Sequence, residues 1–348
     1  MARIALNGFG RIGRLFFRQA FGMPGFEIVA INDLGDLENL AYLVKYDTVY
    51  GRFTRQVICD TAKGVLKVDT KEIKVLQIKD PTQLPWKDLN IDIVIEATGV
   101  FEEYAKAKVH LAQGAKRVIL TAPAKDMDGS TSSPRGGPDG KTVLMGVNEG
   151  DLKTATITSN ASCTTNAASP VIQVMSENPG IAKAILNTVH AYTATQNIVD
   201  GPTKEKDFRR GRAAAQNIVP SSTGAAIAVT RAIKDLEGKF DGIAMRVPVS
   251  AGSLADITFV AKRKTSVEEI NKILSDAAAS PRWQGILKVT HDQVISSDIV
   301  GEPYGAIVDL NFTKVVDGDL VKVLSWYDNE WGYASMLLRH VAAVAQLV

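Results

Sequence analysis

The chain has 348 residues, 45% of them hydrophobic, and its 40 basic and 38 acidic residues give a formal net charge of +2. This length suits two domains, and the near-neutral charge gives no general reason to expect a nucleic-acid partner. Two cysteines cannot form a disulfide framework or a cysteine-based metal site, and no apolar run reaches membrane-spanning length. We therefore expect a cytoplasmic protein without a membrane partner or a bound metal.

A glycine motif follows the first predicted strand. Residues 3–7 form a short apolar run, and Gly8, Gly10 and Gly13 then give the spacing G-x-G-x-x-G at the start of an apolar-periodic helix. In this setting Gly8 allows a tight turn, Gly10 allows a pyrophosphate to approach the backbone, and Gly13 allows the helix to pack on the strand. The pattern predicts a dinucleotide-binding site.

A second strand, residues 27–31, ends just before Asp33, which lies twenty positions after Gly13. A carboxylate at this place can accept hydrogen bonds from the adenosine ribose and would repel the 2′-phosphate of NADP. The sequence therefore predicts NAD as the cofactor.

The next segments repeat the alternation of strand and helix. Residues 91–99 and 117–121 read as buried strands, and residues 102–113 between them read as an amphipathic helix. Such alternation predicts a parallel sheet that binds ligands at the carboxyl ends of its strands, where Gly99 and Thr121 lie.

Two other stretches of this half are read differently. Residues 56–78 suggest antiparallel hairpins added to the sheet. Residues 126–140 are rich in Gly, Ser and Pro and suggest an exposed loop.

Cys163 lies in the run Ser-Asn-Ala-Ser-Cys-Thr-Thr-Asn, directly before an apolar-periodic helix that ends at residues 178–180. A helix N-terminus presents free N–H groups and positive dipole, which should lower the pKa of a thiol placed there. The sequence thus marks Cys163 as a candidate nucleophile. The alternative is a small buried filler residue.

After this helix the pattern changes to strands joined by long connections, with residues 266–279 as one clear helix and a last helix over residues 331–347. We predict an α+β domain with a mostly antiparallel sheet. The long segment 193–220 looks irregular, and loops of that length are usually functional. The strands are expected at residues 181–192, 243–249, 255–262, 306–311 and 320–327.

The predicted fold class is α/β. It has a Rossmann-type doubly wound parallel sheet in residues 1–161, completed by a C-terminal helix within residues 330–348. An α+β catalytic domain with a mostly antiparallel sheet is expected over residues 162–329.

His190 is the best candidate for a base. It ends an apolar strand 27 residues after Cys163. A Cys/His pair can form thiolate and imidazolium at neutral pH, and the imidazole can then move protons. We interpret His110, His291 and His340 as surface or hydrogen-bonded structural histidines.

These motifs together resemble the phosphorylating glyceraldehyde-3-phosphate dehydrogenases over nearly the whole chain. The matching segments are residues 7–14, 32–34, 45–47, 159–166, 190–196, 222–226, 246–248 and 325–333. The cysteine octet and the run Trp-Tyr-Asp-Asn-Glu-Trp-Gly-Tyr are the most specific of them.

The resemblance implies a mechanism in which Cys163 attacks the aldehyde of glyceraldehyde 3-phosphate and His190 takes the proton. Hydride passes to NAD, and inorganic phosphate cleaves the resulting thioester to give 1,3-bisphosphoglycerate. By similarity, one phosphate site takes Thr193 and Arg246, with Arg210 within reach. The other takes Ser162, Thr164, Thr223 and Gly224.

The same resemblance implies the cofactor contacts. Orienting the nicotinamide carboxamide selects the ring face that receives hydride. Lys79 replaces a more usual arginine and Thr121 a more usual serine, so Lys79 would lack planar stacking on adenine. The implied contacts are Arg11 and Ile12 on the pyrophosphate, Asp33 at the ribose, Lys79 and Thr121 near the adenosine half, and Asn329 at the carboxamide. The glycines Gly8, Gly10 and Gly13 of the turn, together with Thr98 and Gly99, complete the cofactor-binding candidates.

Two alternatives stay open. Erythrose-4-phosphate dehydrogenases share the cysteine and histidine motifs, so the second aldehyde is a possible substrate. A protein that keeps the fold only for binding other molecules is another class, although intact Cys163, His190, Arg246 and Asn329 argue against lost catalysis. The resemblance also implies a homotetramer in which segment 193–220 reaches a neighbouring subunit.

Overall fold

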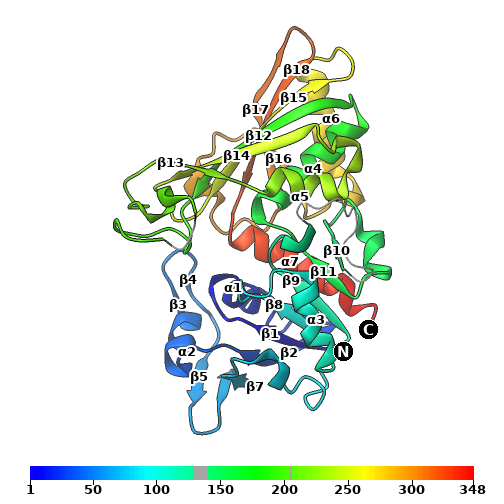
Figure 1. Ribbon diagram of the computed structural model, residues 1–348. Helices are drawn as coiled ribbons and strands as arrows, with labels where there is room; N and C mark the ends of the chain where they lie inside the picture. The colour runs from blue at the N-terminus through cyan, green and yellow to red at the C-terminus, as the bar shows by residue number, and fades with distance from the viewer. Residues whose placement is uncertain (128–139, 204–205) are drawn as a thin grey trace. The chain divides into compact units, whose positions relative to one another are not determined.

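The computed structural model describes residues 1–127, 140–203 and 206–348 (Figure 1). Most of the loop expected over residues 126–140 therefore lies outside the described residues. The chain divides into two compact units. The first comprises residues 1–143, 148–161 and 337–348, and the second comprises residues 144–147 and 162–336. Within the described ranges, no helix is long and apolar enough to cross a membrane.

The first unit is built on a sheet with strand order β10-β11-β9-β8-β1-β2-β7-β6-β5. Neighbours from β10 to β7 pair in parallel, whereas β5, β6 and β7 pair antiparallel, as the hairpin prediction expected. Its strands are β1 (Ala2–Asn7), β2 (Phe26–Asn32), β5 (Val57–Asp60), β6 (Val65–Val68), β7 (Lys71–Leu76), β8 (Ile93–Glu96), β9 (Arg117–Leu120), β10 (Gly140–Thr142) and β11 (Ile157–Ser159). A separate small ribbon pairs β3 (Tyr46–Asp47) with β4 (Gly51–Arg52).

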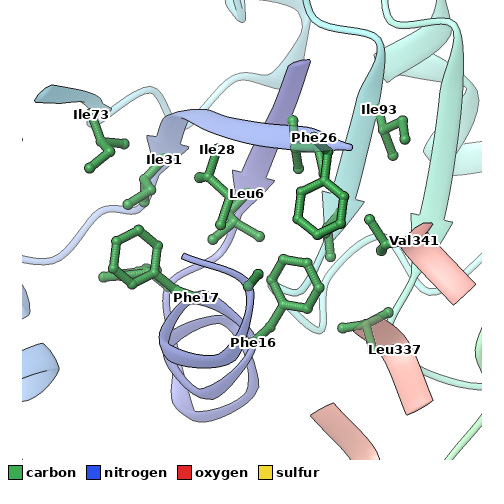
Figure 2. Packing of buried hydrophobic residues seen from close by; sticks show 14 of the residues in the cluster. Leu6, Phe16, Phe17, Phe26, Ile28, Ile31, Ile73, Ile93, Leu337 and Val341 are labelled. Carbon is green, nitrogen blue, oxygen red and sulfur yellow. The ribbon is translucent and has the colours of Figure 1, made fainter. Parts of the chain in front are cut away.

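Helices cover both faces of this sheet. Its helices are α1 (Arg11–Ala20), α2 (Leu37–Lys45), α3 (Tyr104–Ala112) and the end of α7 (Trp331–Ala345). Figure 2 shows Phe16 and Phe17 of α1 packed with Leu6 of β1, and Leu337 and Val341 of α7 beside them. On the opposite face, α3 packs against β9 and β11. The doubly wound prediction is confirmed.

The second unit has a sheet of order β13-β14-β12-β15-β18-β17-β16. Most neighbours pair antiparallel, and β12 with β14 and β16 with β17 pair in parallel. The strands are β12 (Ile181–Ala191), β13 (Val219–Ser222), β14 (Phe240–Val247), β15 (Ser253–Ala261), β16 (Leu287–Thr290), β17 (Ala306–Val316) and β18 (Leu320–Tyr327). The helices are α4 (Cys163–Glu177), α5 (Ala225–Ala232) and α6 (Val267–Ala279).

The prediction of one clear helix between these strands is incomplete, because α5 is a second one. This helix has only eight residues and begins after Gly224 without a side-chain cap, so the sequence carries little periodic signal there. The helix α2 of the first unit was not predicted either, although Asp36 caps it through its side chain.

Candidate active site

Cys163 is the first residue of α4. The hydroxyl of Ser162 caps this helix by accepting a hydrogen bond from the backbone N–H of Thr165 at 3.1 Å. The Sγ atom of Cys163 lies 3.3 Å from Nε2 of His190, which stands near the end of β12. The two candidate catalytic side chains are therefore in direct contact.

The second ring nitrogen of His190 fixes the direction of this contact. Nδ1 lies 2.6 Å from the carbonyl oxygen of Ala191, which can only accept a hydrogen bond. Nη1 of Arg246, which can only donate, also lies 2.9 Å from Nδ1, so these two neighbours require opposite roles of this nitrogen. The shorter contact, to the carbonyl, favours a proton on Nδ1, which leaves the lone pair of Nε2 facing the thiol of Cys163. The ring of Tyr327 packs edge-on against the imidazole, with centroids 5.9 Å apart. The imidazole is thus held as a base that faces the sulfur.

Charge and burial act together on this pair. Although Cys163 keeps an intermediate exposed surface, protein encloses its thiol, and this burial raises the pKa of Cys163. The charge of Arg246 and hydrogen bonds from Thr164 pull the pKa of Cys163 in the opposite direction without overcoming burial. Burial, aided by the charge of Arg246, lowers the pKa of His190 to about 3. The direction of the Cys163 pKa shift is therefore opposite to the expected lowering.

Arg246 lies directly beside His190. The two residues are paired in register between β12 and β14, and Nη1 of Arg246 donates a hydrogen bond to the carbonyl of Ala191 at 3.1 Å. Its Nε atom is buried and has no hydrogen-bond partner in the part of the chain that the structure describes. A buried guanidinium with an unused donor is a suitable site for an anion.

The other phosphate-site candidates lie on the same unit. Arg210 donates to the hydroxyls of Thr195 at 3.0 Å and Ser221 at 2.9 Å, and its charge contributes to the lowered pKa of His190. Thr193 shares a hydrogen bond with Thr195, with their hydroxyl oxygens 2.9 Å apart. These contacts connect Arg210 with Thr195 and Thr193 inside segment 193–220 and with Ser221 just beyond it.

The hydroxyls predicted for the second phosphate site have protein partners. Thr164 shares its hydroxyl hydrogen bond with the phenol of Tyr327 at 2.8 Å. Thr223 accepts a hydrogen bond from the backbone N–H of Ala225 at 3.2 Å, and Gly224 precedes α5 with space around it. Tyr327 was part of a recognised motif but received no role from the sequence, because its partners Thr164 and Thr188 are distant along the chain.

The glycine motif of the first unit has the geometry of a dinucleotide turn. Gly8 has φ of 99°, and a Cβ atom there would lie 2.5 Å from the backbone carbon of Ala97. A Cβ on Gly13 would lie 2.4 Å from the carbonyl oxygen of Gly8, so helix and strand pack closely. At Gly10 a Cβ would meet nothing within 4 Å, which leaves room for a ligand at the uncapped N-terminus of α1.

Asp33 is oriented by this turn. It accepts hydrogen bonds from the backbone N–H groups of Phe9 at 2.6 Å and Gly35 at 2.8 Å, one on each carboxylate oxygen. Carboxylate oxygens have further lone pairs for a ribose hydroxyl. The turn, the open approach at Gly10 and the fixed carboxylate therefore fit NAD.

The side chains of Arg11 and Ile12 are committed to protein contacts. Arg11 forms an ion pair with Asp47 and lies over the ring of Tyr50, 5.2 Å from its centroid. Ile12 packs against the core of the first unit. A pyrophosphate contact by these two residues would therefore use backbone N–H groups.

The remaining cofactor candidates are distributed as follows. Thr98 and Gly99 follow β8, Gly99 with φ of 72°, and Thr121 donates to the carbonyl of Glu96. Lys79 is exposed beyond β7. Asn329 belongs to the second unit, where its Oδ1 accepts a hydrogen bond from Ser253 at 2.9 Å.

The other histidines are surface or hydrogen-bonded structural residues, as expected. His110 and His340 are fully buried and hydrogen-bonded, whereas His291 is exposed.

Comparison with known proteins gives a consistent result. A family model described as the NAD binding domain of glyceraldehyde 3-phosphate dehydrogenase matches residues 2–104, and the C-terminal domain of the same family matches residues 162–329. The glyceraldehyde-3-phosphate dehydrogenase of Clostridium acetobutylicum is 46% identical over 351 residues, covering 100% of this chain and 99% of its own. That of Streptomyces coelicolor is 46% identical, covering 97% and 96% respectively.

Proposed function

Because the chain belongs to the glyceraldehyde-3-phosphate dehydrogenase family, we propose that Cys163 and His190 perform its reaction. This reaction converts glyceraldehyde 3-phosphate, inorganic phosphate and NAD into 1,3-bisphosphoglycerate, NADH and a proton. The observation that carries the proposal is the 3.3 Å contact between Cys163 Sγ and His190 Nε2.

In the first step the sulfur of Cys163 attacks the aldehyde carbon. His190 Nε2 takes the thiol proton and returns it to the aldehyde oxygen, which gives a hemithioacetal. His190 then removes that hydroxyl proton as hydride leaves the carbon, and a thioester remains on Cys163. The chemistry that NAD supplies when bound is acceptance of this hydride.

In the second step an oxygen of inorganic phosphate attacks the thioester carbon. The carbon–sulfur bond breaks and the acyl phosphate leaves. The sulfur of Cys163 takes back a proton from His190, and the proton of the attacking phosphate is released. We assign Arg246, Thr193 and Arg210 to one phosphate group and Ser162, Thr164, Thr223 and Gly224 to the other. The support is that guanidinium, hydroxyl and amide donors gather on the unit that holds Cys163.

We assign NAD binding to residues 1–161 with the C-terminal helix, and catalysis to residues 162–329. The contacts proposed for NAD are the Gly8 to Gly13 turn with Arg11 and Ile12, then Asp33, Lys79, Thr98, Gly99, Thr121 and Asn329. The fit of the glycine turn and Asp33 supports this assignment.

The test is NADH formation with glyceraldehyde 3-phosphate and with erythrose 4-phosphate, each with and without inorganic phosphate. We expect phosphate-dependent turnover that is faster with glyceraldehyde 3-phosphate. A faster rate with erythrose 4-phosphate would favour the alternative dehydrogenase, and no turnover with either aldehyde would favour a binding protein.

Cys163→Ser should abolish this turnover, because a hydroxyl does not form the thioester. Cys59→Ser is the matched control and should retain the wild-type rate. Near wild-type turnover by Cys163→Ser would refute the covalent mechanism.

We also propose that copies of the chain assemble into a homotetramer. Segment 193–220 exposes apolar side chains, among them Phe208 at 80% and Val199 at 73% exposure. Ile185 and Ile243 are likewise exposed on one face of neighbouring strands β12 and β14. Exposed apolar groups of this kind mark protein–protein contacts. Sedimentation at micromolar concentration should give four times the chain mass of 37.5 kDa.

A cytoplasmic location is part of the proposal, since Cys163 must remain reduced to react. Cell fractionation tests it.

A further inference from the structure

We propose that Glu96 is a positioning residue for the cofactor, and that its carboxylate holds the strand ends around NAD in their binding arrangement. This inference rests on the proposed NAD site. Glu96 is the last residue of β8 and is only 4% exposed. A buried carboxylate needs hydrogen-bond donors to offset its lost hydration, and Glu96 obtains them from several directions.

The first donor comes through His110. The indole Nε1–H of Trp86 lies 3.1 Å from Nδ1 of His110, and both side chains are fully buried. An indole only donates, so Nδ1 must be the acceptor and the imidazole proton is on Nε2. Nε2 lies 3.0 Å from Oε2 of Glu96 and donates to it.

A second donor comes through two asparagines. The backbone of Ile78 holds both ends of the Asn32 amide. Oδ1 of Asn32 accepts from the N–H of Ile78 at 2.9 Å, and Nδ2 of Asn32 donates to the carbonyl of Ile78 at 3.0 Å. Asn32 Nδ2 also donates to Oδ1 of Asn7 at 2.7 Å, which leaves Nδ2 of Asn7 to donate to Oε2 of Glu96 at 2.6 Å. The backbone of Ile78 thus sets the orientation of both amides.

The other carboxylate oxygen receives two donors from Thr98. Oε1 accepts the backbone N–H of Thr98 at 2.8 Å and also the hydroxyl of the same residue. Among the described residues, the Glu96 carboxylate thus accepts four hydrogen bonds and donates none. Trp86 fixes the direction of the hydrogen bond from His110, and Ile78 fixes that of the hydrogen bond from Asn7 through Asn32. Only a side chain that accepts hydrogen bonds at both of its terminal atoms and donates none satisfies these four donors.

The partners of Glu96 adjoin the residues assigned to NAD. Asn7 precedes Gly8, Asn32 precedes Asp33, and Ile78 precedes Lys79, while Thr98 is itself a candidate contact. Gly8 has no space for a Cβ against Ala97 and Thr98, so a shift of the chain after Glu96 would move the glycine turn. One carboxylate thereby links the ends of β1, β2 and β8.

Glu96→Gln tests this role with little change of shape. In one orientation of the new side chain its amide NH2 would face the donors of Asn7 and His110, and in the other it would face the backbone N–H of Thr98. Ile78 and Trp86 fix the first two donors and the main chain fixes the third, so neither orientation avoids a contact between two donors. We expect the Kd for NAD, measured by calorimetric titration of the full-length protein, to rise at least about tenfold. Glu27→Gln is the matched control, because Glu27 of β2 forms an exposed ion pair with Lys71 of β7, and it should change the Kd less than twofold.

His110 supplies a second pair of variants, away from the strand ends. In His110→Gln the amide nitrogen can donate to Glu96 and the amide oxygen can accept from Trp86, so NAD affinity should stay close to wild type. His110→Leu leaves Glu96 short of a donor and should raise the Kd severalfold. A purely structural role would instead lower the melting temperature of both variants without separating their NAD affinities.

The outcomes distinguish the two proposals. If the wild-type protein does not bind NAD, the proposed cofactor site fails. If wild type binds NAD and folded Glu96→Gln binds it within twofold, the positioning role is refuted. If Glu96→Gln does not fold, the comparison of His110→Gln with His110→Leu decides, and equal NAD affinities of those two variants would overturn the inference.

Discussion

At the scale of single residues, His190 is oriented before any substrate arrives. The carbonyl of Ala191 holds Nδ1, the ring of Tyr327 packs against one side, and Nε2 faces Cys163. This orientation places the lone pair of Nε2 where it can accept the thiol proton. In the proposed mechanism the Cys163 thiol is the acid and the His190 imidazole is the base of this hydrogen bond.

Substitution His190→Gln removes this base. We expect kcat to fall by roughly 10² to 10⁴, the usual contribution of a positioned general base. Steady-state NADH formation measures the loss, and stoichiometric labelling of Cys163 by iodoacetamide verifies that the thiol is intact. A kcat within tenfold of wild type would assign the proton transfer to another group.

Tyr327→Phe removes only a hydroxyl. That hydroxyl bonds to Thr164 and Thr188 at 2.8 Å each, and the residue is buried. Two buried hydroxyls then lose a partner, so the free energy of unfolding should fall by about 1–3 kcal/mol in urea denaturation. Tyr42→Phe, at an exposed phenol, should change it by less than about 0.5 kcal/mol. Equal stability of the two variants would contradict the proposed anchoring of Tyr327.

At the scale of elements, the turn between β1 and α1 combines two kinds of glycine. Gly8 is required by its positive φ and by backbone atoms of Ala97 and Thr98, which lie within 2.6 Å of the place that a Cβ atom would occupy. Gly10 has no such neighbour within 4 Å. The fold therefore requires glycine at position 8, whereas at position 10 it would accommodate a side chain, and the absence of one leaves the approach open.

These roles can be separated by substitution. Gly8→Ala should lower the free energy of unfolding by about 2 kcal/mol or more, because both conformation and space oppose a side chain. Gly10→Ala should cost less than about 1 kcal/mol and yet raise the Kd for NAD at least about tenfold, since the methyl group occupies the pyrophosphate approach. Urea denaturation and NAD titration provide the two measurements. Wild-type NAD affinity in Gly10→Ala would place the pyrophosphate elsewhere.

At the scale of the whole molecule, buried histidines couple stability to pH. Burial lowers the pKa of both His190 and His340 to about 3, against about 6.5 for an unfolded histidine. The unfolded chain therefore binds more protons below pH 6.5. Their contribution to stability is complete above pH 6.5 and is lost as the pH falls from 6.5 towards 3.

At pH 5 each histidine should lower the free energy of unfolding by about 2 kcal/mol relative to pH 7. Urea denaturation at pH 7, 6 and 5 measures this slope. His340→Gln should weaken the dependence of the free energy of unfolding on pH by the contribution of one histidine. An unchanged slope in that variant would mean that folding does not lower the pKa of His340.

How much of the fold and of the candidate site could be predicted from the sequence depends on how far apart along the chain the interacting residues lie. The run β1, α1 and β2 was predicted because each element has its own apolar period and the glycines mark the turn. The short helix α5 was not, since eight residues after an uncapped glycine carry little local signal. Glu96 was missed as well, because Asn7 and His110 lie 89 and 14 positions away.

The sequence by itself determined the local chemistry of this protein. It placed a thiol at a helix start, a dinucleotide turn after a buried strand, an acidic residue twenty positions beyond it, and a family resemblance along the chain. Only the tertiary structure decided which polar groups are buried and what they face. It reversed the expected direction of the Cys163 pKa and aimed four donors at Glu96, because desolvation and hydrogen-bond direction depend on segments that meet only after folding.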